Sequence, residues 1–180
     1  MNKETLAIHA GYNKDTQGTM AVPIYQSTAY AFETAQQASD RFTLQDLGNI
    51  YTRLTNPTTA TLEARIAELE GGASAIATSS GQAAIFYAIS NLFETGDNII
   101  ISDKIYGGSV TLFKHTMKRF GLEARVFELD NPETINALVD DKTKAIFFES
   151  LSNPQIAVAD IDAISAIAKN MVLFLFVIIQ

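Results

Sequence analysis

Residues 74–93, SAIATSSGQAAIFYAISNLF, indicate the fold by the order of their residue types. A short apolar segment leads through the turn Ser80-Gly81-Gln82 into a helical pattern that continues to Leu92. This order is typical of a strand, a tight turn and a helix start. The first amides of a helix lack intrahelical partners and carry a partial positive charge, so they bind phosphate well. Gly81 has no Cβ and lets a ligand approach the backbone, although a simple packing turn would also favour glycine there.

Short apolar segments alternate with helical patterns along the rest of the chain. We expect strands over residues 75–78, 98–102, 125–129, 144–149 and 172–179. We expect helices over residues 34–44, 57–70, 82–92, 110–120, 132–139 and 160–169. This alternation predicts an α/β fold: a mostly parallel sheet, joined by right-handed crossovers, with helices on both faces. Ligands of such sheets bind outside the carboxyl ends of the strands.

The first third of the chain has a different character. Residues 1–33 lack a steady apolar period and are punctuated by Gly11, Gly18 and Pro23, which predicts an extended arm. We expect an N-terminal arm and loop over residues 1–57 and an α/β domain over residues 58–180, with an atypical tail at 170–180.

Composition excludes several classes of function. The 180 residues are 47% hydrophobic and carry a formal net charge of −7, which argues against broad binding to nucleic acid or to anionic membranes. The apolar run 171–179 is too short to cross a bilayer. The N-terminal residues contain no apolar run, so we expect no signal peptide. The absence of cysteine excludes disulfides and thiolate metal sites and favours a cytoplasmic location. His9 and His115 lack metal-ligand spacing, so we expect no metal site.

Two further loops follow predicted strands at the carboxyl edge of the sheet. Tyr106 precedes two glycines and could present its ring to a planar ligand. A buried core tyrosine before a helix would show the same sequence pattern. Glu149 ends an apolar strand and Asn153 follows it, so a carboxylate and an amide could orient a polar ligand there. The alternative is that Asn153 caps the next segment.

A polar loop before the first long helix contains Tyr51 and Arg53. An arginine can clamp a phosphate through two hydrogen bonds, and a tyrosine can add a third. A solvated loop would have the same composition.

Five motifs, in this order, resemble those of one known family. They are Ala21-Val22-Pro23-Ile24-Tyr25-Gln26-Ser27-Thr28, Tyr51-Thr52-Arg53-Leu54-Thr55-Asn56-Pro57-Thr58, Ser80-Gly81-Gln82-Ala83-Ala84, Tyr106-Gly107-Gly108 and Glu149-Ser150-Leu151-Ser152-Asn153-Pro154. The chain resembles the Cys/Met-metabolism family of pyridoxal 5'-phosphate (PLP) enzymes over residues 1 to about 170. Within that family it is most similar to enzymes of the O-acetylhomoserine sulfhydrylase type.

The resemblance implies a role for each motif. Gly81 and Gln82 would bind the cofactor phosphate, and Tyr106 would stack on the pyridine ring. Asn153 would hydrogen-bond the ring's 3′ oxygen, and Glu149 would support that edge. The resemblance also implies that Tyr51 and Arg53 reach the phosphate of a neighbouring subunit, so that a homo-oligomer, a dimer or tetramer, builds the site. Tyr51 and Tyr106 are then the catalytic candidates.

The implied reaction is γ-replacement on an amino-acid substrate, O-acetylhomoserine, with sulfide or a thiol, as in homocysteine and methionine biosynthesis. Methionine γ-lyases of the family carry a cysteine at the position of Gly108, which argues against that activity. A cystathionine γ-synthase or γ-lyase activity stays open. A generic nucleotide-binding α/β domain fits less well, because no G-x-G-x-x-G turn is present.

The chain departs from the family pattern at its end. Family members carry an Asp that pairs with the pyridine nitrogen and, further on, the Lys that forms the Schiff base, and neither is identified here. Residues 170–180 do not resemble the family sequence. We therefore expect an incomplete fold-type-I PLP domain. Lys104 is the lysine nearest the predicted site, and an ordinary surface role is expected for it. This leads to two readings: the first part of such an enzyme, or a non-catalytic remnant of one.

Overall fold

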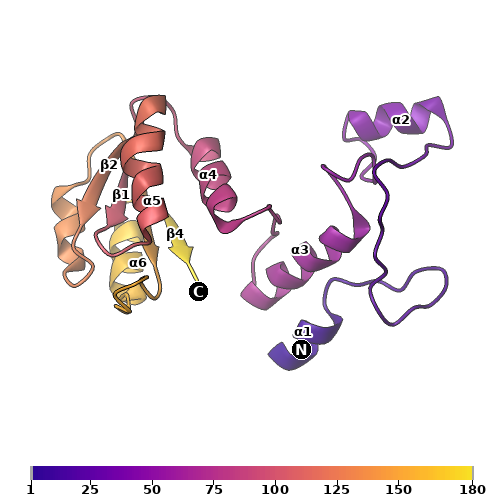
Figure 1. Cartoon of the computed structure of the whole chain (residues 1–180), viewed down its shortest axis with the longest axis horizontal. Helices are drawn as coiled ribbons and strands as arrows, with labels where there is room; N and C mark the ends of the chain where they lie inside the picture. Colours follow the sequence, from indigo (N-terminus) through magenta and orange to yellow (C-terminus); the bar gives the residue numbers. More distant parts are fainter. Residues whose placement is uncertain (1, 180) are drawn as a thin grey trace. The chain divides into compact units, whose positions relative to one another are not determined.

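The computed structural model describes residues 2–179 (Figure 1), which divide after residue 78 into two compact units. The N-terminal unit holds helices α1 (Lys3–His9), α2 (Ala35–Phe42) and α3 (Pro57–Glu70). The second unit holds the sheet. The division expected from the sequence lay after residue 57, whereas the compact units divide after residue 78, which places α3 with the N-terminal segment.

The sheet of the second unit is parallel throughout. Its strands are β1 (Asn98–Ser102), β2 (Glu123–Phe127), β3 (Thr143–Glu149) and β4 (Phe174–Ile178), in the order β2-β1-β3-β4. The two central strands are apolar and almost wholly buried, as expected of a sheet covered on both faces. The α/β fold class predicted from the sequence is therefore confirmed.

Successive residues of a strand point to opposite faces of the sheet, so the buried strands place apolar side chains on both faces. Helices cover each of these faces. Ile99, Ile101 and Phe147 face a core that includes residues of α4 (Gly81–Leu92). The same core includes Phe113 and Met117 from the helical run 107–120, which comprises α5 (Gly107–Thr111), η1 (Leu112–Thr116) and η2 (Met117–Phe120).

The other face has its own core. Ile100, Ile146 and Phe148 pack there with residues of η3 (Pro132–Ala137) and α6 (Ile161–Asn170). The predicted helix at 132–139 is a short 3₁₀ helix. The sheet is thus sandwiched between helical layers, as the sequence predicts.

Local capping explains where the long helices begin and end. Asn56 accepts a hydrogen bond from the Thr58 amide, Pro57 occupies the first turn, and Gly71 ends α3 at a φ of 65°. Ser80 accepts from the Ala83 amide at the start of α4, and Asp160 accepts from the Ala163 amide at the start of α6. The bounds of these three helices agree to within one residue with the ranges 57–70, 82–92 and 160–169 expected from the sequence.

Two sequence predictions are wrong in the N-terminal unit. Residues 75–78 form no strand; the Ala77 amide instead donates to Glu63 Oε1 on α3 at 2.8 Å, which satisfies the backbone locally. The expected extended arm begins with a helix, α1, because Asn2 caps it through the Thr5 amide and α3 supplies a packing surface.

The tail, which was expected to depart from the family pattern, folds as a strand. Residues 174–178 pair in parallel register with β3, from Phe174 opposite Ala145 to Ile178 opposite Glu149. Strand β4 starts later than predicted because Val172 adopts a φ of 56°. Met1 and Gln180 lie outside the described residues. No helix within residues 2–179 is long and apolar enough to cross a membrane.

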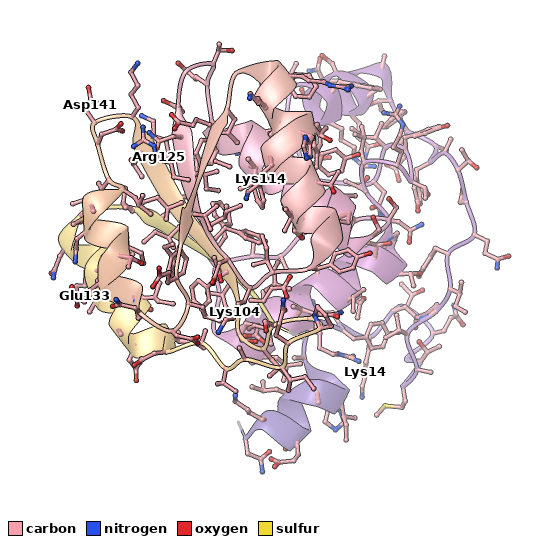
Figure 2. The ribbon with its side chains drawn as sticks, turned by 60° about the vertical axis from the view of Figure 1, so that its left-hand side comes forward. Lys14, Lys104, Lys114, Arg125, Glu133 and Asp141 are labelled. Carbon is pink, nitrogen blue, oxygen red and sulfur yellow. The ribbon has the colours of Figure 1, made fainter. Side chains whose placement is uncertain are left out.

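A polar cluster closes the amino-terminal end of the sheet. Asn98 donates from Nδ2 to Asp140 Oδ1 at 2.8 Å and accepts from Thr143 Oγ1 at 2.8 Å. Arg125 Nη2 pairs with Asp140 Oδ2 at 2.8 Å. The hydrogen bonds from Asn98 and then Arg125 hold the pKa of Asp140 well below its ordinary value. Figure 2 places Arg125 at one end of the sheet and Lys104 at the other.

This cluster predicts an acid-dependent loss of stability. Because the pKa of Asp140 is lowered in the folded state, its contribution is fully present above 3.8, its ordinary pKa, and is lost as pH falls through the lower folded pKa. We expect Asp140→Asn to be less stable than the wild type in urea unfolding at pH 7, with the difference shrinking below pH 3.8. Asp141→Asn, one residue on, is the matched control and should track the wild type at every pH. A difference for Asp140→Asn that does not vary with pH would contradict the linkage.

Candidate cofactor site

The candidate site begins with a buried carboxylate at the carboxyl end of β3. Glu149 is 1% exposed, and its two oxygens serve two different loops. Oε1 accepts the backbone amide of Tyr106 at 2.9 Å, and Oε2 accepts the amide of Asn153 at 3.2 Å. The loop of Tyr106, 43 residues before Glu149 in sequence, and the loop of Asn153, four residues after it, are therefore fastened to one side chain. The sequence suggested that Glu149 supports this edge, and the contacts give the physical means.

The start of α4 lies at the same edge. Gln82, in the first turn, donates from Nε2 to Ser109 Oγ at 3.1 Å, and Ser109 lies three residues after Tyr106. The glycine turn and the Tyr106 loop thus lie close together at one edge of the sheet and not at opposite ends of it. The sequence alone could not show that the start of α4 and the Tyr106 loop lie close together.

Two amides at the start of α4 are available to a ligand. The Ala83 amide is bonded to Ser80 Oγ and the Ala84 amide to Ser80 O. Among residues 2–179, no acceptor bonds the amides of Gly81 or Gln82. A Cβ built on Gly81 or on Gly107 would meet no heavy atom within 4 Å, so the space beside both is open. Helix α4 is 12 residues long, which gives its first turn a substantial dipole.

Tyr106 presents an accessible ring, 48% exposed, at the start of α5. Gly108 makes room for this ring, since a Cβ at that position would lie 2.4 Å from the ring's Cε1. The observed ring position therefore requires glycine at 108. Any larger residue would make the ring rotate away.

Ser109 is a site residue that sequence reasoning missed. It is 1% exposed, and its hydroxyl accepts the Gln82 side chain, so it links α4 to α5. A serine inside a helix start carries no signal of such a role in a single sequence. Only the crossover that brings the two helix starts together reveals it.

Asn153 lies on the loop after β3, with its backbone amide held by Glu149 and its side chain exposed. The loop is closed by Ser152, which is buried and accepts the Ala157 amide through Oγ at 3.0 Å. The exposed carboxamide is therefore free to meet a ligand while its backbone is fixed.

Tyr51 and Arg53 lie in the N-terminal unit. Tyr51 forms an isolated antiparallel bridge with Ala29, and the Thr52 amide donates to Thr28 O at 2.9 Å, so the arm holds this loop. The guanidinium carbon of Arg53 is 5.5 Å from the Tyr51 ring centroid, within cation–π range. Both side chains are exposed.

The arm is also fastened to the start of α3. Asn56 Nδ2 donates to Tyr25 O at 2.9 Å, and Thr58 Oγ1 donates to Pro23 O at 2.9 Å. The first two motifs of the resemblance thus form one local structure, in which the arm supports the Tyr51–Arg53 loop.

Lys104 is engaged elsewhere. Its ammonium group pairs with Asp130 Oδ2, and its side chain is 23% exposed. Within the described part of the chain, no group of three or more His, Cys, Asp or Glu side chains is arranged to hold a metal ion.

These features define a class of protein. The sequence model of the Cys/Met metabolism PLP-dependent enzymes matches residues 4–179, and the chain belongs to that family. The chain is 50% identical over 169 residues to O-acetyl-L-homoserine sulfhydrylase of Corynebacterium glutamicum, covering 93% of this chain and 39% of that protein. It is 46% identical over 170 residues to homocysteine/cysteine synthase of Saccharomyces cerevisiae, covering 93% of this chain and 38% of that protein.

Solved structures agree with this fold. A crystal structure of a putative O-acetylhomoserine (thiol)-lyase from Campylobacter jejuni matches with a TM-score of 0.94 and 56% identity, over 98% of this chain and 44% of that one. That protein carries N'-pyridoxyl-lysine-5'-monophosphate at position 205. Cystathionine gamma-lyase from Lactobacillus plantarum, complexed with L-serine, matches with a TM-score of 0.88 and 34% identity, over 98% and 44%. The chain spans about two-fifths of the length of the curated relatives it matches.

The residues of the site fit PLP. A helix start with two available amides suits a dianionic phosphate. An accessible ring at Tyr106 suits a planar pyridine, and the exposed amide of Asn153 suits a ring oxygen. All three come from the second compact unit, residues 79–180.

Proposed function

We propose that this chain binds PLP and serves γ-replacement on O-acetylhomoserine with sulfide or a thiol. The observation that carries the proposal is the double hydrogen bond of Glu149, which fixes the Tyr106 and Asn153 loops at one edge of the sheet. Similarity to sulfhydrylases, at 50% and 46% identity, supports the choice of reaction. The glycine at 108 is consistent with it as well.

The roles of the side chains follow from their chemistry. The amides of Gly81 and Gln82 would bind the phosphate, the Tyr106 ring would stack on the pyridine, and the Asn153 carboxamide would donate to the ring's 3′ oxygen. Bound PLP supplies an electron sink for the substrate's carbon framework. Glu149 acts through the two backbone amides that it holds and is a positioning residue.

Tyr51 and Arg53 complete the proposal through a second copy of the chain. Their exposed guanidinium and phenol groups are suited to a phosphate, and the arm preorganises their loop. We propose that they reach the phosphate bound by a neighbouring subunit in a homo-oligomer.

A specific prediction concerns the 180-residue polypeptide by itself. We expect a weak, reversible PLP complex and little or no γ-replacement, because Lys104, the lysine nearest the Tyr106 loop in sequence, is held by Asp130. The measurements are PLP absorbance during titration and dialysis, turnover of O-acetylhomoserine with sulfide, and intact mass after borohydride reduction. No pyridoxyl adduct should appear.

Two results would contradict this expectation. Turnover at rates like those of the sulfhydrylases would show that the catalytic groups are complete. A reduced adduct on Lys104 that disappears in Lys104→Arg would show that this lysine leaves Asp130 for the cofactor. The second reading, a non-catalytic remnant, is supported if even the weak complex is absent.

A further inference from the structure

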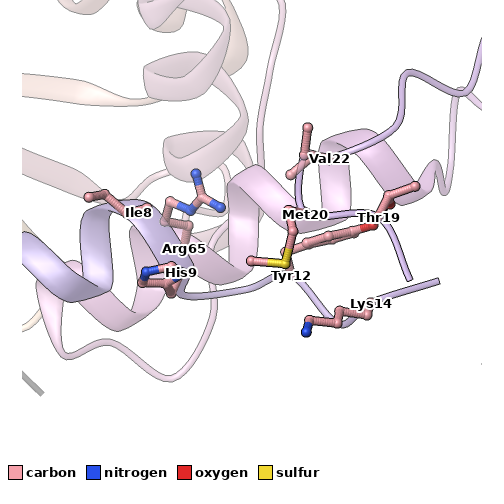
Figure 3. Close-up of a pocket in the computed structure, with 9 residues that line it drawn as sticks. Ile8, His9, Tyr12, Lys14, Thr19, Met20, Val22 and Arg65 are labelled. Atoms are coloured by element: carbon pink, nitrogen blue, oxygen red, sulfur yellow. Dashed lines mark hydrogen bonds between the residues drawn. The ribbon is translucent and has the colours of Figure 1, made fainter. Parts of the chain in front are cut away.

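The N-terminal unit contains a pocket of about 240 Å³ that the proposed function does not use (Figure 3). It is built from the end of α1, the loop that follows, and α3. Its polar lining consists of His9, Tyr12, Lys14, Thr19 and Arg65. Apolar side chains, Ile8 and Val22 among them, complete it. Figure 3 shows His9 and Arg65 on one side, Lys14 on the other and Tyr12 between them.

The charges in this pocket are of one sign. Three of its side chains, His9, Lys14 and Arg65, are basic types, and no aspartate or glutamate lines it. This is notable in a chain with a net charge of −7. Asp15, the acid next to Lys14, is turned to its own loop, where Oδ1 accepts the amides of Gln17 and Thr19.

The strongest donor is only partly used. Arg65 is half-buried, and its Nε donates to Ala10 O at 2.9 Å, which fixes the plane of the guanidinium. Within residues 2–179 its two Nη groups have no acceptor, and Lys14 has none either. The hydroxyls of Tyr12 and Thr19 hydrogen-bond each other and can share a further acceptor.

We propose that this pocket binds a small phosphorylated molecule. A fixed guanidinium fork and a flexible ammonium group match the geometry and the double charge of a phosphate monoester. The apolar walls formed by Ile8 and Val22 would contact the organic part. The residues that line this pocket belong to the first compact unit, whereas Gly81, Tyr106 and Asn153 belong to the second.

The test is a phosphate titration of the full 180-residue chain that is monitored by ¹⁵N NMR. The probes are inorganic phosphate and glycerol phosphate. Ionic strength is kept constant, and chloride is the reference salt. Both phosphates should shift the amides of residues 8–22 and the Arg65 Nε–H signal. Because phosphate can also bind at α4, the amides of residues 79–83 report that event separately. Glycerol phosphate should bind more tightly than inorganic phosphate, since only it reaches the apolar walls.

Variants assign the site. Lys14→Gln removes a charge that makes no contact in the fold, and we expect it to weaken phosphate binding about fivefold. Arg65→Gln should weaken it about tenfold or more, because its donors are partly desolvated. Lys3→Gln, an exposed lysine on α1 outside the pocket, is the matched control and should bind like the wild type. Unmoved signals at residues 8–22, or equal affinities of Lys14→Gln and Lys3→Gln, would overturn the proposal.

Discussion

Glu149→Ala is expected to lower the free energy of unfolding by about 2–5 kcal/mol, because it leaves the amides of Tyr106 and Asn153 without their acceptor in a buried setting. The same change should abolish measurable PLP binding, since the two loops lose their common anchor. Urea unfolding followed by circular dichroism measures the first effect, and PLP absorbance measures the second. The two losses share one cause, the carboxylate that lies between two loops.

Graded variants separate the anchor from a general loss of folding. Glu149→Gln keeps one acceptor oxygen, so we expect about half of the stability loss and a weakened PLP complex. Glu128→Gln, an exposed glutamate just after β2, is the control and should leave both quantities unchanged. Wild-type PLP affinity in a folded Glu149→Gln protein would remove Glu149 from the site.

Gly81→Pro should weaken PLP binding by roughly 10- to 100-fold while changing the free energy of unfolding by less than about 1 kcal/mol. Proline is tolerated at the first helical position, and Ser80 already has the extended backbone, φ −165° and ψ 161°, that a following proline requires. The substitution therefore removes the Gly81 amide hydrogen, which we propose donates to the cofactor phosphate. Spectroscopic titration with PLP gives the affinity, and thermal unfolding gives the stability.

Gly81→Ala is the matched control for that experiment. It keeps the amide, and its Cβ would enter space with no heavy atom within 4 Å. We expect PLP affinity close to that of the wild type. If Gly81→Pro binds PLP as tightly as Gly81→Ala, the phosphate is held elsewhere, and the cofactor site has to be redrawn.

Some elements of this fold could be predicted from the sequence, and one predicted strand could not form. The apolar runs of β1 and β3 were readable because both faces of a central parallel strand are buried, so the middle residues of each strand are apolar. The starts of α3, α4 and α6 were readable to within one residue because a cap acts within three residues of itself. By contrast, 75–78 has strand-like residues but no neighbouring strand, and pairing is not a local property.

The roles assigned to Gly81, Gln82, Tyr106, Glu149, Asn153, Tyr51 and Arg53 stay predictions, to be decided by the experiments above. What the fold adds is their arrangement. The 43-residue separation between Tyr106 and Glu149 is closed by two successive crossovers, from β1 to β2 and from β2 to β3, and no single-sequence pattern gives the register that puts a carboxylate opposite an amide.

The sequence by itself determined the alternation of strands and helices in the second unit, the bounds of the long helices α3, α4 and α6, and the family of the chain, because these depend on residue types close together along the backbone. The tertiary structure alone decided that Glu149 holds two loops, that Ser109 joins α4 to α5, and that Lys104 is occupied by Asp130. Each of these contacts joins residues from different elements, so it exists only after the chain has folded and the sheet has set its register.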